Sequence, residues 1–318
     1  MRTVADALQT FISDLELTDR QYEEANQQRQ VVTSHLQRGL SVKNTFISGS
    51  FGRSTAIRPL HDIDLFITLN RPAHEDLRQG GPDTCLKKIR AVLADAYPNK
   101  ELPTIQGRSI NIQFTGTGIG FDIVPAFEDS RDPDVYEIPD RNVRGWIRSN
   151  PRLHKDYSSK ANERADTKAK PLVKALKHWN CNQPGKKPLR SFHLELMVYA
   201  ALQSPPATYA DGIALLFADL VQRVMSPCPD PAGLGPDVAA GFSPERLQRA
   251  QGFLRAAADT AQRALDAGNT GRTEEAHYHW RSLFGDAYPE RGKAPGAAAP
   301  AVITTPRTAP DDPAKRFG

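Results

Sequence analysis

The feature that most constrains the fold of this chain is a pair of aspartates at the start of an apolar strand. Asp62 and Asp64 open the run Asp-Ile-Asp-Leu-Phe-Ile-Thr-Leu, whose β-branched and aromatic residues predict a strand at 63–69. Side chains at positions i and i+2 leave a strand on the same face, so the two carboxylates lie side by side. They repel each other unless a cation lies between them. The chain must therefore present this strand to a cation or an equivalent partner.

Two further signals accompany the pair. Gly49-Ser50 follows a predicted strand at 45–48 and precedes a predicted helix at 52–57, and such a turn points N–H groups and a hydroxyl at an anion. Asp122 lies in another predicted strand, 120–127, where an apolar residue is the default. Each aspartate alone is equally consistent with a turn or a cap. Together the three carboxylates predict a hard-oxygen site for Mg²⁺ or Mn²⁺.

This arrangement predicts a particular chemistry. Two such ions about 3.5–4 Å apart support in-line nucleotidyl transfer. One ion holds a nucleoside triphosphate, and the other lowers the pKa of the attacking hydroxyl. Asp122 is expected to lie nearest that hydroxyl, while Gly49 and Ser50 hold the phosphates of the donor.

The periodicity of the apolar residues divides the chain into unlike parts. Before residue 150 helical and strand patterns alternate; beyond it only helical patterns remain. The helices are predicted at 3–16, 18–39, 84–97, 162–180, 190–203, 207–225, 243–267 and 271–284, with a further strand at 109–114. We therefore predict an α+β fold with a catalytic lobe over 1–150, which includes the N-terminal helices and a small mixed sheet, and a helical lobe over 151–290. The 28 residues of 291–318 hold five prolines and seven alanines, which predicts a disordered tail.

Composition excludes several classes of protein. No run of about 18 apolar residues predicts a membrane span, and the N-terminus lacks the apolar region of a signal peptide. Three distant cysteines argue against a disulfide scaffold, so we expect a cytoplasmic protein. The net charge of +4 does not by itself indicate a nucleic-acid binder, but from Asp140 to Arg190 there are 14 basic and 4 acidic residues, a surplus of +10. Either a polyanion approaches this segment or these are solvated helix faces.

The residues GSFGRSTAIRPLHDIDLFITL together with FDIVPAF resemble the DNA polymerase β-like nucleotidyltransferases. More closely, they resemble the bacterial CD-NTases, relatives of cyclic GMP-AMP synthase and oligoadenylate synthase. The resemblance covers roughly residues 20–285. It implies an enzyme of a CBASS anti-phage system that condenses ATP or other NTPs into a cyclic di- or trinucleotide and releases pyrophosphate. Ser54 stands where the family often has glycine, which is a small departure.

A second segment supports the resemblance. PLVKALKHWN and LRSFHLELM are similar to the helical core of oligoadenylate synthases. The resemblance implies that Lys177 contacts the donor triphosphate, with Lys174 one turn earlier as second choice, and that Ser191 touches phosphate while Phe192 stacks on the donor base. Arg53 either faces phosphate or pairs with a carboxylate. The lysines are also consistent with a solvated helix face, and Phe192 with plain core.

The C-terminus has a separate implication. In CBASS systems with a ubiquitin-ligase-like partner, the flexible end of the synthase is conjugated to targets, which here implies conjugation through Gly318. A HORMA-type partner that binds such a tail is the other family possibility, and an ordinary disordered end is the third. The sequence does not separate these three.

Two competing functions share parts of this evidence. A linear or RNA-tailing nucleotidyltransferase has the same metal chemistry, but no additional RNA-binding domain is apparent after residue 285. An inactive nucleotide-binding scaffold of the same fold is disfavoured because all three carboxylates are present. The sequence therefore favours a cyclic oligonucleotide synthase.

Overall fold

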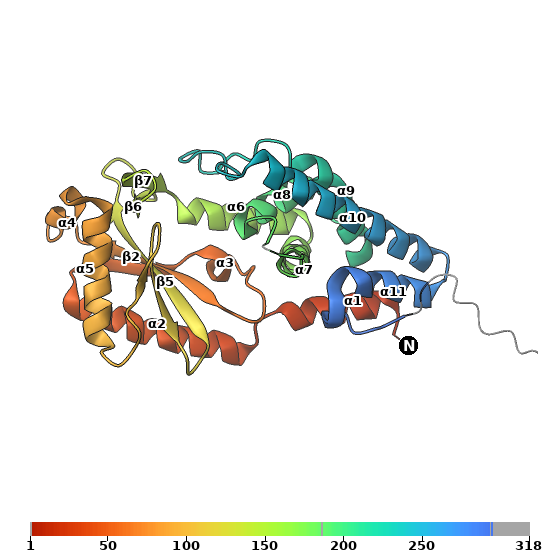
Figure 1. The fold of residues 1–318 in the computed structure, drawn as a ribbon, viewed down its shortest axis with the longest axis horizontal. Helices are drawn as coiled ribbons and strands as arrows, with labels where there is room; N and C mark the ends of the chain where they lie inside the picture. The colour runs from red at the N-terminus through yellow and green to blue at the C-terminus, as the bar shows by residue number, and fades with distance from the viewer. Residues whose placement is uncertain (1, 186, 293, 295–318) are drawn as a thin grey trace, which may run out of the picture.

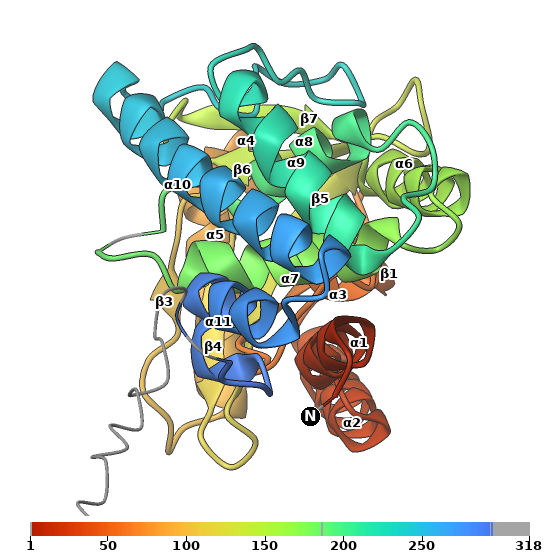
Figure 2. The ribbon, with the colours of Figure 1, turned by 90° about the vertical axis from the view of Figure 1, so that its right-hand side faces the viewer.

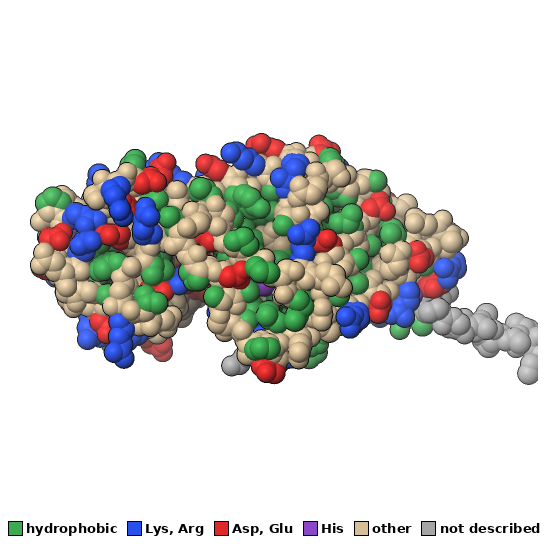
Figure 3. Space-filling model, turned by 90° about the horizontal axis from the view of Figure 1, so that it is seen from above, with side chains coloured by type: hydrophobic (Ala, Val, Ile, Leu, Met, Phe, Trp, Pro, Cys, Tyr) green, Lys and Arg blue, Asp and Glu red, His purple; other side chains and the backbone are tan. Residues whose placement is uncertain are grey.

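The computed structural model describes residues 2–185, 187–292 and 294. Two lobes lie end to end (Figure 1), and the space-filling view narrows between them (Figure 3). Among the described residues, strands occur only in the first lobe, and the second is helical, as the periodicity predicts. The predicted tail and its conjugation residue Gly318 fall almost entirely outside the described residues. No helix in the described ranges is long and apolar enough to span a membrane.

The first lobe is built on a seven-stranded mixed sheet. Five strands run in the order β1-β2-β5-β4-β3, and a β6–β7 hairpin continues from the end of β5. The central pair, β2 and β5, is parallel, and the other pairs are antiparallel. The strands are β1 (Val42–Ile47), β2 (Asp62–Leu69), β3 (Thr104–Ile105), β4 (Ile110–Phe114), β5 (Ile119–Glu128), β6 (Tyr136–Asp140) and β7 (Gly145–Ser149).

The alternation in β2 decides which face is covered. Ile63, Leu65 and Ile67 are fully buried beneath α2 (Asp19–Gly39) and α5 (Gly81–Ala96). The opposite face carries Asp62 and Asp64, because side chains alternate along a strand. One face of the sheet therefore forms the core, and the other is left for polar chemistry.

The Gly-Ser turn differs in detail from its prediction. The helix expected at 52–57 is a single turn, α3 (Gly49–Gly52), that begins at the glycine itself. Gly49 has φ +60°, a left-handed backbone that favours glycine. Thr55 and Ala56 donate their N–H groups back to the Ser50 carbonyl, which ends the helix early.

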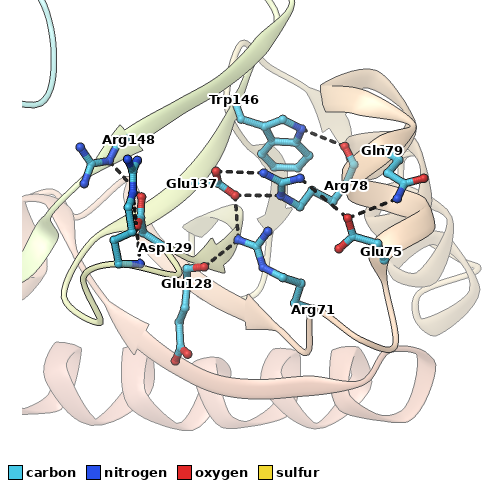
Figure 4. Close-up of polar contacts among 10 residues, drawn as sticks. Arg71, Glu75, Arg78, Gln79, Glu128, Asp129, Glu137, Trp146 and Arg148 are labelled. Atoms are coloured by element: carbon cyan, nitrogen blue, oxygen red, sulfur yellow. Dashed lines mark hydrogen bonds and ion pairs between the residues drawn. The ribbon is translucent and has the colours of Figure 1, made fainter.

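The β6–β7 hairpin was not predicted. Glu137 fastens it to α4 (Glu75–Gln79) and to the loop before that helix. It accepts hydrogen bonds from Arg78 on α4 at 2.8 and 3.1 Å and from Arg71 in the loop at 2.8 Å (Figure 4). The Trp146 indole N–H also donates to the Arg78 carbonyl at 3.0 Å. The two guanidinium groups hold the pKa of Glu137 below its ordinary value. The hairpin is therefore fixed from both of its strands.

In the part of the chain that the structure describes, the second lobe packs seven helices around one apolar core. They are α1 (Val4–Leu15), α6 (Pro151–Arg164), α7 (Ala169–Cys181), α8 (Ser191–Ala201), α9 (Tyr209–Arg223), α10 (Pro244–Asn269) and α11 (Thr273–Phe284). The prediction placed α1 with the first lobe, whereas its stripe Leu8, Phe11 and Ile12 is buried in this core, and Figure 2 shows it beside α11. Phe11 stacks on Phe284 at 4.4 Å between ring centroids. The boundary between lobes at residue 150 remains a prediction.

Candidate active site

The parallel pairing of β2 with β5 places the three predicted carboxylates together. Asp64 is directly opposite Asp122 in the register, and Asp62 is opposite Gly120. Gly120 leaves room for this, since a Cβ there would lie 2.3 Å from Asp62 Oδ1. Asp62 is exposed, and Asp64 and Asp122 are half-buried. The aspartates thus come from neighbouring strands onto one open face.

Amide groups from β4 hold two of these carboxylates. Asn111 is opposite Asp122 in the register. Its Nδ2 donates to Asp122 Oδ1 at 2.9 Å and to Asp62 Oδ1 at 3.1 Å. Gln113 Nε2 also donates to Asp62 Oδ1, at 2.9 Å. A single amide therefore bridges two carboxylates on different strands.

The inner carboxylates are poorly stabilised as anions. The pKa of Asp64 is raised to about 6. Burial is the largest cause, and the negative charges of Asp122 and Asp62 add to it, while the positive charge of Arg53 opposes the rise. Burial also raises the pKa of Asp122, although hydrogen bonds from Asn111 and Gln106 oppose the rise. Like charges in a partly dry site favour either a proton or a bound cation.

The Gly-Ser turn lies directly against this site. The Ser48 N–H donates to the Asp64 carbonyl at 2.9 Å, which fastens the turn to β2. A Cβ on Gly49 would lie 1.6 Å from Asp64 Oδ2, so only glycine allows the backbone this close to the carboxylate. The turn and the aspartates therefore form one unit.

The residues fit a hard divalent cation by the chemistry of their donors. Three carboxylates reach one face, and their mutual repulsion would be relieved by a cation. Within the described ranges, no three Asp, Glu, His or Cys side chains are gathered in a ready coordination geometry. In this arrangement Asn111 and Gln113 donate hydrogen bonds to one oxygen of Asp62, and Asn111 donates to one oxygen of Asp122. The site thus has the carboxylate ligands that a hard divalent cation prefers, and amide donors hold two of these carboxylates.

A cavity of about 530 Å³ opens beside the inner carboxylates. Asp64 and Asp122 line it from the sheet, and Arg108 lines it from the loop before β4. The helical lobe contributes Arg190, which is held by the Val238 and Ala240 carbonyls at 3.2 and 3.1 Å. Burial, Arg246 and Arg108 lower the pKa of Arg190. The cavity thus joins carboxylates from one lobe to guanidinium groups from both.

The predicted Arg53 and Lys177 meet at a carboxylate that was not predicted. Glu195 on α8 is fully buried. It accepts from Arg53 at 2.9 and 3.1 Å and pairs with Lys177 Nζ at 2.5 Å. Lys177 also donates to the Thr55 carbonyl at 3.0 Å, and the Thr55 hydroxyl donates to Glu195 at 3.0 Å. The two cations hold the pKa of Glu195 below its ordinary value despite burial.

The remaining predicted residues of the helical lobe are placed as follows. Lys174 is 6% exposed and pairs with Glu16 at 2.7 Å. Ser191 is exposed at the first position of α8. Phe192 is half-buried, with the Arg53 guanidinium 4.9 Å from its ring centroid. Phe192 therefore packs against the Arg53 guanidinium at the edge of the helical core.

Sequence reasoning missed Asn111, Gln113, Arg108, Arg190 and Glu195 as parts of the site. Asn111 and Gln113 carried a signal, since they form the polar face of an alternating strand that was correctly predicted. Arg190 was indicated only as one of the 14 basic residues of 140–190, and Glu195 was not indicated at all, because its partners lie far away in the sequence. Glu195 meets Arg53 across 142 positions.

A known family model and curated relatives match this chain. The family model for the Second Messenger Oligonucleotide or Dinucleotide Synthetase domain matches residues 1–162. A relative from an Acinetobacter species, named cyclic AMP-AMP-AMP synthase, is 27% identical over 265 residues, which is 77% of this chain and 73% of the relative.

Solved structures of low sequence identity share the fold. Escherichia coli CdnC, solved in complex with HORMA-deltaN, is similar with a TM-score of 0.66 and 20% identity over 89% of this chain and 98% of that chain. Vibrio cholerae DncV is similar with a TM-score of 0.70 and 13% identity over 88% and 93% of the two chains. The predicted polymerase β-like fold is thereby confirmed.

The family model covers half of the chain, including β2, β5 and all three aspartates. The open face that holds these aspartates lies inside the matched range. The chain is accordingly a nucleotidyltransferase and belongs to the family of second messenger oligonucleotide or dinucleotide synthetases.

Proposed function

We propose that this enzyme condenses nucleoside triphosphates, ATP among them, into a cyclic oligonucleotide and releases pyrophosphate at each bond. The observation that carries the proposal is the register of β2 with β5, which sets Asp64 against Asp122 with the Gly49 backbone beside them. The name of the Acinetobacter relative supports adenine nucleotides and a cyclic trinucleotide as the product class.

The carboxylates have distinct proposed roles. Asp62 and Asp64 hold the cations, and Asp122 completes the site beside the acceptor hydroxyl. Two Mg²⁺ or Mn²⁺ ions would supply charge neutralisation for the donor phosphates and a lowered pKa for the attacking hydroxyl. Asn111 orients Asp62 and Asp122 through its shared amide. Gly49 and Ser50 present backbone N–H groups to the donor phosphates.

The contacts proposed for the helical lobe depend on two ion pairs. Lys177 and Lys174 are engaged with Glu195 and Glu16. A direct phosphate contact from either lysine therefore requires its pair to open. Ser191 and Phe192 need no such change, and we assign them to the donor phosphate and base.

A cyclic product is favoured over a linear one by the names of the relatives, and one experiment decides between them. Purified protein is incubated with Mg²⁺ and α-³²P-labelled NTPs, singly and mixed, and the products are treated with phosphatase and analysed by mass spectrometry. A cyclic product keeps its label after phosphatase and has no terminal phosphate. If every labelled product loses a terminal phosphate, the enzyme is a linear polymerase. Mn²⁺ in place of Mg²⁺, and EDTA, test the metal requirement.

Replacement of Gly49 tests the contact between the turn and the carboxylates. Gly49→Ala should lower nucleotidyl transfer at least a hundredfold, since its Cβ would overlap Asp64 Oδ2 and its φ of +60° disfavours alanine. Gly116→Ala is the matched control, because nothing lies within 4 Å of a Cβ there. Pyrophosphate release measures the effect. Wild-type activity in Gly49→Ala would contradict the proposed role of the turn.

The biological setting is proposed from the same relatives. The E. coli cyclase was solved with a HORMA protein, and others are named CBASS cyclases. We therefore propose a role in anti-phage defence in the cytoplasm, with a HORMA-type or ubiquitin-ligase-like accessory protein as partner. Pull-down of each purified accessory protein with the full chain, and with a chain ending at residue 290, tests whether the tail makes the contact.

A further inference from the structure

A cavity of about 940 Å³ lies in the helical lobe, away from the aspartates. We call it the end cavity, because α1, α11 and the last turns of α10 gather at the end of the molecule opposite the sheet (Figure 1). Its walls are residues 2–6 at the start of α1, residues 207–211 at the start of α9, and residues of the α10–α11 turn between Ala264 and Thr273. Nothing in the proposed reaction uses it.

The lining of the end cavity includes many apolar side chains, several of them small. Ala5 and Ala207 are exposed, and Ala210 is half-buried. Leu8 and Trp280 also line the cavity and are almost fully buried. Accessible apolar surface of this kind gains free energy when an occupant removes it from water.

The charged groups at the end cavity already have partners in the described structure. The Asp6 carboxylate accepts from the Thr3 hydroxyl at 2.7 Å, and the Asp211 carboxylate accepts from the Thr208 hydroxyl at 2.7 Å. Each carboxylate lies in the first turn of its helix, where it is favourable beside the positive end of the helix dipole. Lys168 is paired with a neighbouring aspartate at 3.0 Å. The end cavity therefore suits an uncharged, apolar occupant.

The first and last parts of the described chain meet at α11, which lies beside α1 (Figure 2). His277 on α11 is fully buried. Its Nε2 donates to the Arg2 carbonyl at 2.9 Å, and its Nδ1 accepts from the Tyr288 hydroxyl at 2.8 Å. One side chain thus holds the start of a cavity wall and the segment that follows α11.

The chain then runs back along α11 toward the end cavity. A Cβ on Gly292 would lie 2.2 Å from the Glu274 carbonyl oxygen and from the Tyr278 backbone nitrogen, so the backbone at residue 292 passes directly over the first turns of that helix. Thr273, the first residue of α11, lines the end cavity. The residues beyond 294 therefore begin beside the cavity.

The segment that follows has the composition that the end cavity suits. Residues 295–306 carry no charge, and residues 297–303 read Ala-Ala-Ala-Pro-Ala-Val-Ile. Pro300 disfavours a helix. Ile303 is nine residues beyond Ala294, and nine extended residues span at most about 30 Å. That length exceeds the distance of about 8–10 Å between two packed helices, so the segment can reach across the cavity.

From this placement we propose that residues 297–303 of this chain dock into the end cavity, with Val302 and Ile303 against Ala5 and Ala210. The short connection to α11 makes the contact intramolecular, which gives the segment an effective concentration in the millimolar range. Docking leaves the aspartates open and does not depend on the proposed reaction. An accessory protein that binds this part of the tail would have to displace it first.

Hydrogen exchange of the full chain, followed by mass spectrometry, tests the proposal. In wild type the amides of residues 301–303 should exchange at least about fivefold more slowly than in Ala210→Glu, because a charge in the apolar cavity releases the segment. The amides of residues 314–317 should exchange equally in both proteins. Ala218→Glu is the matched control and should keep the protection, since Ala218 is an exposed residue of α9 outside the cavity lining.

A second pair of variants changes the tail instead of the cavity. Val302→Asp combined with Ile303→Asp should speed the exchange of the Asp6 and Asp211 amides about twofold or more, because these amides lie in the first turns of α1 and α9 that the segment would cover. Ala309→Asp combined with Ala314→Asp adds the same charge beyond the segment and should leave both amides unchanged.

Three results would overturn the assignment. Equal exchange of residues 301–303 in wild type and Ala210→Glu would mean that the segment does not dock in the end cavity. Protection that is lost when the protein is diluted would mean that the cavity takes the tail of a second copy. Unchanged Asp6 and Asp211 amides in the first tail variant would mean that this segment does not cover the cavity walls. None of these measurements uses nucleotidyl transfer, so such a failure leaves the proposed function intact.

Discussion

Asp64→Asn should lower the rate of nucleotidyl transfer at least about a thousandfold, while the protein should be as stable as wild type or more stable. The activity is lost because a charged cation ligand is replaced by a neutral amide, and such a ligand set contributes several kcal/mol to the transition state. The stability is kept or raised because the charge of Asp64 is unfavourable in the folded protein without metal. Burial and the neighbouring aspartates raise the pKa of Asp64 to about 6, so its ionised form, which dominates at pH 7, costs folding free energy that asparagine does not.

The measurement pairs pyrophosphate release with thermal unfolding at pH 7 in the absence of metal. Asp62→Asn should lose activity similarly. Asp95→Asn is the control, since Asp95 is an exposed carboxylate on α5, and it should change neither quantity appreciably. More than a tenth of wild-type activity in Asp64→Asn would refute its assignment as a cation ligand, whatever the unfolding temperature does.

The parts of this site that could be predicted from the sequence are those encoded by short-range periodicity. Two aspartates spaced by one residue in an apolar strand can reach only one face, and the register with Asp122 follows once the strands are parallel neighbours. The alternation of Asn111 and Gln113 in the predicted strand 109–114 is likewise local, and both side chains reach the carboxylates in the structure. Patterns of this kind depend on only a few neighbouring residues, so the sequence alone reveals them.

The parts that could not be predicted depend on contacts between distant segments. The stripe of α1 indicates a helix with one buried face but not which lobe buries it. The β6–β7 hairpin has a short strand that contains a proline, Pro139, and this weakens the strand pattern. Glu195 lies in a helix of apolar residues, where nothing local says that Arg53 and Lys177 will meet it.

The contact at Glu195 leads to the second prediction, on stability. Glu195→Ala should destabilise the protein by about 3–5 kcal/mol, because removing one partner of a buried ion pair leaves the others uncompensated. Here Arg53 and Lys177 would remain as two positive charges, 8% and 4% exposed, with no buried carboxylate between them. For a protein of 318 residues that free energy corresponds to a fall of about 5–8 °C in Tm.

The matched variants separate charge from packing. Glu195→Gln keeps the shape of the side chain and a hydrogen bond to Arg53 but removes the charge, so its loss should be intermediate. Adding Lys177→Gln to Glu195→Gln removes one unpaired cation, and the double variant should lose less than the sum of the two single changes. The exposed pair Arg20–Glu24 supplies the control, since Glu24→Gln should cost less than about 1 kcal/mol.

If Glu195→Ala unfolds at the same temperature as Glu24→Gln, the buried network does not stabilise the joint between the lobes. A large loss would mean that the Gly-Ser turn, which leads directly into Arg53, is held in place by the helical lobe as well as by β2.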